Sequence, residues 1–196
     1  MKKYARNIPN LLSGLRLLSV PVLIYLAVGG HEKAFFILWM FSAATDALDG
    51  WIARTFRLQT PLGAKLDSTA DSLLYLATLA GVYWLKWDEF GHYRTQALLI
   101  VAYILAVDIF SLVKFGRISS LHLYSWKIGG VLQSLFVFWL FWKGFDARFF
   151  QVVFWWTTLA FAENILIQSM MHTYRTNMRN FIWFYRNVYQ KQNRVF

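Results

Sequence analysis

Six apolar segments of helical length divide the 196-residue sequence, and this pattern constrains the fold more than any other feature. A helix of about 20 apolar residues crosses the hydrocarbon core of a bilayer. Because backbone polar groups in lipid must be satisfied within the segment, helices are expected in all six. The sequence therefore predicts an all-α integral membrane protein with about six transmembrane helices, preceded by a short interfacial segment at the amino terminus. The segments lie at residues 9–29, 34–55, 62–85, 94–114, 125–143 and 149–171.

The composition agrees with a membrane protein. Hydrophobic residues make up 58% of the chain and charged residues only 15%, whereas soluble domains carry about 25% charged residues. The net charge of +10 is spread between the apolar segments, which argues against a nucleic-acid-binding face. The chain has no cysteine, so disulfides and thiolate metal sites are excluded.

The distribution of Lys and Arg predicts the topology. If the amino terminus is cytoplasmic, the outer connections carry five of the twenty basic residues and the cytoplasmic side carries the rest. An excess of Lys and Arg marks cytoplasmic loops. We therefore expect a multi-pass protein of the cytoplasmic (inner) membrane with both termini inside. The outer group is Lys33, Lys86, Arg94, Lys143 and Arg148.

Four of the ten acidic residues gather at 45–72, at the predicted cytoplasmic ends of the second and third helices. Asp46 and Asp49 lie within about 60° of each other on one helical face, and Asp67 and Asp71 are one turn apart on the next helix. Carboxylates this close repel one another, so we expect positive charge between them. Oxygen donors select a hard ion, Mg²⁺ or Mn²⁺, and four carboxylates suit a pair of ions.

Small and basic residues flank these acids. Gly50 and Gly63 leave the backbone open to a ligand, and Arg54 presents a planar fork suited to phosphate. Lys65 either neutralises the cluster or meets a substrate phosphate. The alternative is an ordinary pair of helices whose acids cap helix ends or pair with nearby Lys and Arg.

The spacing of these residues resembles the signature of the CDP-alcohol phosphotransferases, membrane enzymes of phospholipid synthesis. The match covers eight positions, Asp46-x2-Asp49-Gly50-x2-Ala53-Arg54-x8-Gly63-x3-Asp67-x3-Asp71. The start, Asn7-Ile8-Pro9-Asn10-Leu11-Leu12-Ser13-x2-Arg16, is similar to bacterial phosphatidylglycerophosphate synthases and CMP-forming cardiolipin synthases. The resemblance implies six transmembrane helices, a homodimer and a site that opens toward the cytoplasm.

The resemblance also implies a reaction: a phosphatidyl group passes from CDP-diacylglycerol to a small alcohol, and CMP is released. The expected acceptor is glycerol 3-phosphate, with phosphatidylglycerol, inositol phosphate or serine as alternatives. The alternative from another class of protein is a divalent-cation transporter. The implied metal ligands are Asp46, Asp49, Asp67 and Asp71, with Asp71 also the general base. The implied CDP-binding residues are Asn10, Ser13, Gly50, Ala53, Arg54 and Gly63.

Arg16 falls two turns into the first helix, where an unpaired charge is costly. It either snorkels to the membrane surface or contacts substrate phosphates or an acid of the cluster. Glu163, in the last span, is expected to make a structural hydrogen bond with Asn164 or Gln168. The role of Asp108 is left open.

A basic loop and a basic tail complete the predicted cytoplasmic side. The loop at 114–127 has no acid and suits an anionic acceptor, although a loop that touches lipid phosphates is the alternative. The expected domains are a transmembrane catalytic domain, 1–171, and a basic aromatic tail, 172–196, which suits an interfacial helix on anionic lipid better than nucleic acid. The candidate acceptor-binding residues are Lys65, Lys114, Arg117, His122 and Lys127.

Overall fold

The computed structural model of the chain is all-helical over the residues it describes. These are 8–55, 61–119, 121, 123–174, 176 and 178–190, with the side chains of 8–10, 46–54, 61, 62 and 64 outside the described set. No strand occurs in this part of the chain. The prediction of an all-α protein is confirmed. A short interfacial segment is also expected at the amino terminus, where residues 1–7 lie outside the described residues.

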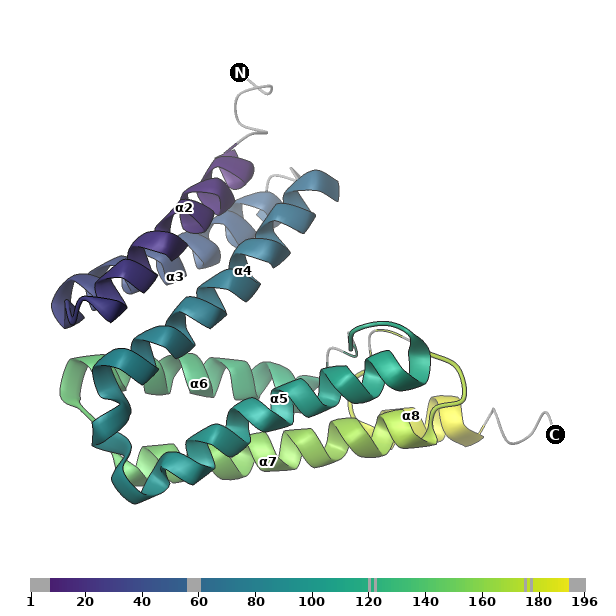
Figure 1. Cartoon of the computed structure of the whole chain (residues 1–196). Coiled ribbons are helices and arrows are strands. Elements are labelled where there is room, and N and C mark those ends of the chain that lie inside the picture. The colour runs from purple at the N-terminus through teal and green to yellow at the C-terminus, as the bar shows by residue number, and fades with distance from the viewer. Residues whose placement is uncertain are drawn as a thin grey trace. The chain divides into compact units, whose positions relative to one another are not determined.

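Six long helices follow the six apolar segments within a few residues (Figure 1). Short π and 3-10 turns join α4 to α5, and two further turns follow α7. The long helices are α2 (Ile8–Val28), α3 (Glu32–Thr55), α4 (Pro61–Gly81), α5 (Arg94–Phe115), α6 (Tyr124–Lys143) and α7 (Ala147–Met170). The short elements are η1 (Val82–Lys86), η2 (Trp87–Tyr93), α8 (Phe181–Phe184) and η3 (Tyr185–Tyr189).

Among the residues that the structure describes, three stretches are long and apolar enough to cross a membrane, as judged by length and composition. They are Leu11–Val28, Lys65–Phe115 and Ala147–Met170. The second stretch has 51 residues, more than twice the length of one span, and it includes most of α4 and all of α5. Gly91, at φ +49°, breaks the helical backbone between them, because a positive φ is accessible mainly to glycine.

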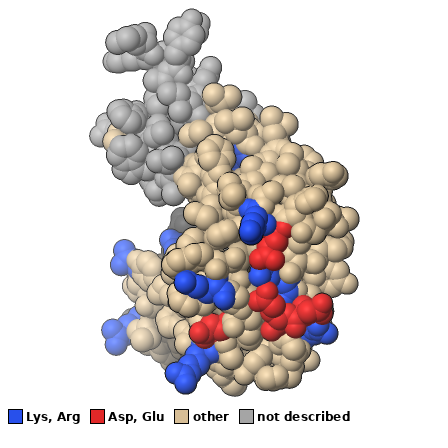
Figure 2. Space-filling view, turned by 90° about the vertical axis from the view of Figure 1, so that its left-hand side faces the viewer, with Lys and Arg blue, Asp and Glu red and all other residues tan. Residues whose placement is uncertain are grey.

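The chain divides into two compact units, Met1–Asp88 and Glu89–Phe196. In the first unit, α2 packs along both α3 and α4. The outward face of α2 is apolar, with Leu18 69% exposed and Tyr25 70% exposed. Exposed apolar side chains on a long helix are the surface expected against lipid tails. The unit also contains an ion pair between the buried Lys86 Nζ and the partly exposed Glu32 Oε1, at 2.7 Å. Figure 2 shows that one face of the molecule carries both acidic and basic side chains.

The buried side chains of this unit change from polar to apolar along α2. From Val20 onward its buried side chains are apolar, namely Val20, Leu23 and Ala27. Before Val20 the buried side chains among its described residues are polar, namely Ser13, Arg16 and Ser19. Because polar groups are buried only where they have partners, the first half of α2 is where a polar site is expected.

In the second unit, α5 and α6 both pack on α7. An aromatic cluster that includes Phe90, Phe136 and Phe150 fills one end, with the Phe90 and Phe136 ring centroids 6.2 Å apart. Glu89 braces the turn between α6 and α7, because its Oε2 accepts a hydrogen bond from the Phe145 backbone N–H at 2.9 Å. This turn is thus held to η2 by a side chain.

Gly81 gives a test of the first unit's packing. A Cβ at this position would lie 2.1 Å from Cζ of Phe35, a ring with no exposed surface. Gly81→Ala should therefore destabilise the protein by about 1–3 kcal/mol, as overpacking does, in thermal unfolding followed in detergent. Gly130→Ala is the control, because a Cβ there meets nothing within 4 Å. Equal stability of the two variants would contradict the packing.

Candidate active site

A buried arginine brings two of the predicted site acids together. Arg16, on α2, is 1% exposed, and its Nη1 donates hydrogen bonds to Asp67 Oδ1 at 3.1 Å and to Asp71 Oδ1 at 2.6 Å. The two acids lie one turn apart on α4, and their side chains are 41% and 50% exposed. The guanidinium therefore offsets part of the charge of two carboxylates that remain open to solvent.

Of the two alternatives for Arg16, the contact with acids of the cluster is confirmed, because the side chain is buried against α4. Removing an arginine from water is favourable only when charged partners compensate for the lost hydration. The buried Arg16 thus requires the two acids of α4 beside it. The acids in turn have a positively charged partner, the guanidinium, even when no metal ion is bound.

Side-chain hydrogen bonds set the register of the three helices. Ser19 on α2 and Ser42 on α3 share a buried hydrogen bond at 2.9 Å, which places Arg16 level with Thr45, directly before Asp46. Because the α2–α3 turn is short, the two helices are antiparallel. In Figure 1 the start of α2, the end of α3 and the start of α4 lie at the same end of the unit.

A second contact aligns α3 with α4. Trp39 Nε1 donates a hydrogen bond to Thr78 Oγ1 at 2.8 Å. Asp46 follows Trp39 by seven residues and Asp71 precedes Thr78 by seven, which is about 10 Å along each helix. The antiparallel register therefore brings the backbones of the two acid pairs to the same level of the unit.

The donor chemistry at this level fits a hard cation. The described acids offer carboxylate oxygens, the ligands that Mg²⁺ and Mn²⁺ prefer. Among the side chains that the structure describes, no group of three or more His, Asp or Glu gathers around one point. Asp46 and Asp49 have side chains outside this set, so the predicted four-carboxylate centre stays a prediction.

The predicted CDP-binding residues are only partly described. Ser13 is 3% exposed and lies one turn before Arg16 on α2. Gly63 is half-buried in the first turn of α4. Four others, Asn10, Gly50, Ala53 and Arg54, are placed on α2 or α3 only by their backbone, and their side-chain positions lie outside the described residues.

The candidate acceptor-binding residues do not form one described group. Lys114 Nζ donates to the backbone carbonyls of Gln168 and Ser169, at 2.8 and 2.7 Å, so it caps the end of α7. The Arg117 guanidinium lies 5.3 Å from the Tyr174 ring centroid, and Lys127 lies 5.9 Å from that of Tyr124.

For the remaining two candidate acceptor-binding residues, Lys65 and His122, the described part of the chain gives no contact that bears on acceptor binding. Lys65 is exposed on α4. His122 lies outside the described residues.

Glu163 makes the expected structural hydrogen bonds, but with other partners. Its Oε1 accepts from the Phe181 backbone N–H at 2.8 Å and its Oε2 accepts from Ser125 Oγ. The predicted partners Asn164 and Gln168 instead bond each other at 2.8 Å. The reason is that both lie on the buried face of α7, whereas Glu163 points to α6 and the C-terminal segment.

Sequence reasoning missed the buried hydroxyls around Arg16. Ser19 Oγ bonds the Arg16 carbonyl at 2.7 Å, and Thr45 Oγ1 bonds the Ser42 carbonyl at 2.7 Å. The sequence did contain a pattern that indicates these buried polar contacts. Ser13, Arg16 and Ser19 recur every three residues, slightly less than one helical turn, so they lie along one side of a mostly apolar helix.

Comparison with known proteins gives partial alignments to two kinds of enzyme. A CDP-diacylglycerol–glycerol-3-phosphate 3-phosphatidyltransferase of Pseudomonas fluorescens is 43% identical over 76 residues, 37% of this chain and 39% of that protein. A cardiolipin synthase (CMP-forming) of Streptomyces coelicolor is 39% identical over 105 residues, 48% and 49% of the two chains. An Aquifex aeolicus protein with the same name as the first is 36% identical over 93 residues, 47% and 49%.

The chain spans less than half the length of these relatives in each alignment. No solved structure matches the chain. The family model of the CDP-alcohol phosphatidyltransferases, in contrast, matches residues 6–163, a range that contains Arg16 and all eight signature positions. Since this match covers most of the sequence, the chain belongs to the CDP-alcohol phosphatidyltransferase family.

Proposed function

We propose that the protein transfers a phosphatidyl group from CDP-diacylglycerol to a small alcohol and releases CMP. The observation that carries the proposal is the pairing of the buried Arg16 with Asp67 and Asp71, two signature acids of a family member. Both carboxylates keep a solvent-exposed surface, as groups that meet a substrate must. The register of α3 supports a contribution from Asp46 and Asp49 at the same level.

In the proposed reaction Asp71 is the general base. It takes the proton of the acceptor hydroxyl as that oxygen attacks the β-phosphorus of CDP-diacylglycerol. The new oxygen–phosphorus bond forms while the bond between the β-phosphorus and the bridging oxygen breaks, and CMP departs with that oxygen. Arg16 keeps the carboxylate in place through the 2.6 Å hydrogen bond, so the base acts by position.

Two divalent ions, Mg²⁺ or Mn²⁺, are proposed for the same centre. Asp46, Asp49, Asp67 and Asp71 would hold them, and bound ions would supply charge stabilisation for the diphosphate. The Asp67 and Asp71 side chains are 41% and 50% exposed although both contact Arg16, so an ion can reach them from solvent. Asn10, Ser13, Gly50, Ala53, Arg54 and Gly63 are proposed to contact the CDP group.

Glycerol 3-phosphate is the proposed acceptor. Two of the relatives carry this substrate in their names, while a third is named as a cardiolipin synthase. Arg117 and Lys127 are exposed cations that suit an anionic acceptor, whereas Lys114 is already engaged by α7 carbonyls. Phosphatidylglycerol, inositol phosphate and serine are the alternative acceptors within the same chemistry.

The proposed topology has six crossings, with both termini and the site on the cytoplasmic side, and a homodimer as the assembly. Helices α3 and α6 have 24 and 20 residues, enough to cross a bilayer. The three apolar stretches refer only to described side chains, a set that excludes residues 46–54 of α3. Site acids at one end of the helices favour an enzyme over a cation transporter, which needs polar groups along the membrane depth.

An acceptor panel tests the proposed function. Purified protein is incubated with CDP-diacylglycerol, Mg²⁺ or Mn²⁺ and one acceptor at a time, and CMP release is measured. Release is expected with glycerol 3-phosphate, should stop with a chelator and should return when excess ion is added. Phosphatidyl transfer would be contradicted if no acceptor in the panel released CMP.

Asp71→Asn tests the base. The amide oxygen can still accept the Arg16 hydrogen bond but cannot take a proton, so turnover should fall by about 10²–10⁴-fold while CDP-diacylglycerol binding persists. The two quantities are measured by CMP release and by equilibrium binding of the donor. Turnover at the wild-type rate would rule out Asp71 as the base.

Arg16→Gln tests the positioning of the acids. Without the guanidinium, Asp67 and Asp71 repel each other and lose their fixed orientation, so kcat/KM should fall by about 10–100-fold, the range seen for groups that orient metal ligands. Arg16→Lys should recover part of this loss, because it restores the charge without the fork. Lys33→Gln, an exposed cation of the same unit, is the control. An Arg16→Gln enzyme as active as Lys33→Gln would refute the role.

A further inference from the structure

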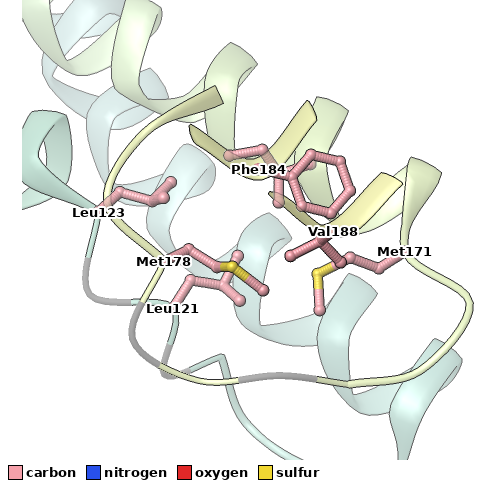
Figure 3. Packing of buried hydrophobic residues seen from close by; sticks show 7 residues of the cluster. Leu121, Leu123, Met171, Met178, Phe184 and Val188 are labelled. Carbon is pink, nitrogen blue, oxygen red and sulfur yellow. The ribbon is translucent and has the colours of Figure 1, made fainter. Parts of the chain in front are cut away.

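The segment that follows α7 packs against the rest of the second unit. The Met178 backbone N–H donates to the Leu121 carbonyl at 2.8 Å, and the Tyr124 N–H donates to the Arg179 carbonyl at 3.0 Å. A buried apolar cluster joins this segment to the 121–123 loop and α7 (Figure 3). Its members are Leu121, Leu123, Ile167, Met171, Met178, Phe184 and Val188. The segment therefore has a defined inward face.

Glu163 fixes the depth of this segment relative to α7. Its carboxylate accepts the Phe181 backbone N–H at 2.8 Å, where the helical run of α8 and η3 begins. Glu163 lies seven residues before the end of α7, a candidate membrane span, which is about 10 Å along the helix. A 24-residue helix is about 36 Å long, so α7 centred on a hydrocarbon core of about 30 Å would extend about 3 Å beyond it at each end. Glu163, and with it the Phe181 N–H, would then lie about 7 Å inside one boundary, within the depth of about 5–10 Å that interfacial helices occupy.

The outward face of this helical run combines apolar and cationic side chains. Ile182 is 63% exposed and Tyr185 is 42% exposed, while Arg179 and Arg186 are exposed beside them. Every residue from 164 to 190 is neutral or basic. A helix with apolar and aromatic groups beside Arg, held at the membrane boundary, has the composition of an interfacial helix.

We propose that the outward face of residues 179–190 binds an anionic phospholipid surface. Ile182 and Tyr185 enter the boundary between head groups and acyl chains, and Arg179 and Arg186 contact lipid phosphates. Charge complementarity selects this partner, because the run offers cations without acids to a surface that carries negative charge. This binding does not depend on the proposed phosphatidyl transfer.

The chain has no cysteine, so Ile182→Cys introduces one labelling site for an environment-sensitive dye. The labelled protein is reconstituted in vesicles of phosphatidylcholine, with or without phosphatidylglycerol. Brominated phosphatidylcholine reports contact of the dye with lipid, and acrylamide reports its exposure to water. In phosphatidylglycerol vesicles the dye should be quenched by bromine and shielded from acrylamide, and high salt should reverse both effects.

Charge variants in the labelled protein identify the contacts. Arg179→Gln with Arg186→Gln should lower the ratio of lipid-bound to water-exposed dye about 25-fold, since each Arg near an anionic surface contributes about fivefold. Lysine at both positions should retain the wild-type ratio, which separates loss of charge from loss of fold. Arg148→Gln, an exposed arginine in the first turn of α7, should have no effect.

Two results would overturn the proposal. One is equal acrylamide quenching in both vesicle types, with no effect of the double glutamine variant. The other is shielding that rises with the protein-to-lipid ratio instead of with phosphatidylglycerol, which would mean that the face binds a second copy of the chain.

Discussion

The pairing of Arg16 with Asp67 and Asp71 is the interaction on which the proposed site depends. A fully buried guanidinium requires compensating charge, and the two half-exposed carboxylates of α4 supply it. The same contact ties the amino-terminal helix to the second half of the signature. Because α2 also bonds α3 through Ser19 and Ser42, one helix links both acid-bearing helices. The first unit is therefore organised around α2.

The division of the α2 core into a polar and an apolar half explains how a membrane helix carries such a site. Apolar burial holds the far half of the unit, where Phe35 packs on Gly81. Buried hydrogen bonds stabilise the half that carries the acids. There the hydroxyls of Ser19, Ser42 and Thr45 each have a hydrogen-bond partner. Polar residues inside a membrane bundle are tolerated when they bond one another. The apolar packing and the proposed site thus occupy opposite ends of the same helices.

Much of the fold followed from the sequence, because hydrophobic length and helix breaks are local properties. The six helix ranges agree with the apolar segments within about four residues. The partner of Arg16 was left between two alternatives, since spacing along α2 gives its face but not the register of α4. Glu163 was assigned partners on its own helix, yet it bonds Ser125 and Phe181. Contacts between helices far apart in sequence are set by tertiary packing, which periodicity does not encode.

In the proposed site, acids of α3 and α4 gather with Arg16 around one cation-binding centre. This centre can be tested by titrating Mn²⁺ into the purified protein and following the free ion by electron paramagnetic resonance. Saturable binding is expected, and it should weaken in each of Asp46→Asn, Asp49→Asn, Asp67→Asn and Asp71→Asn. Binding that is lost only with acids of one helix, or that none of the four substitutions changes, would contradict a centre shared by the two helices.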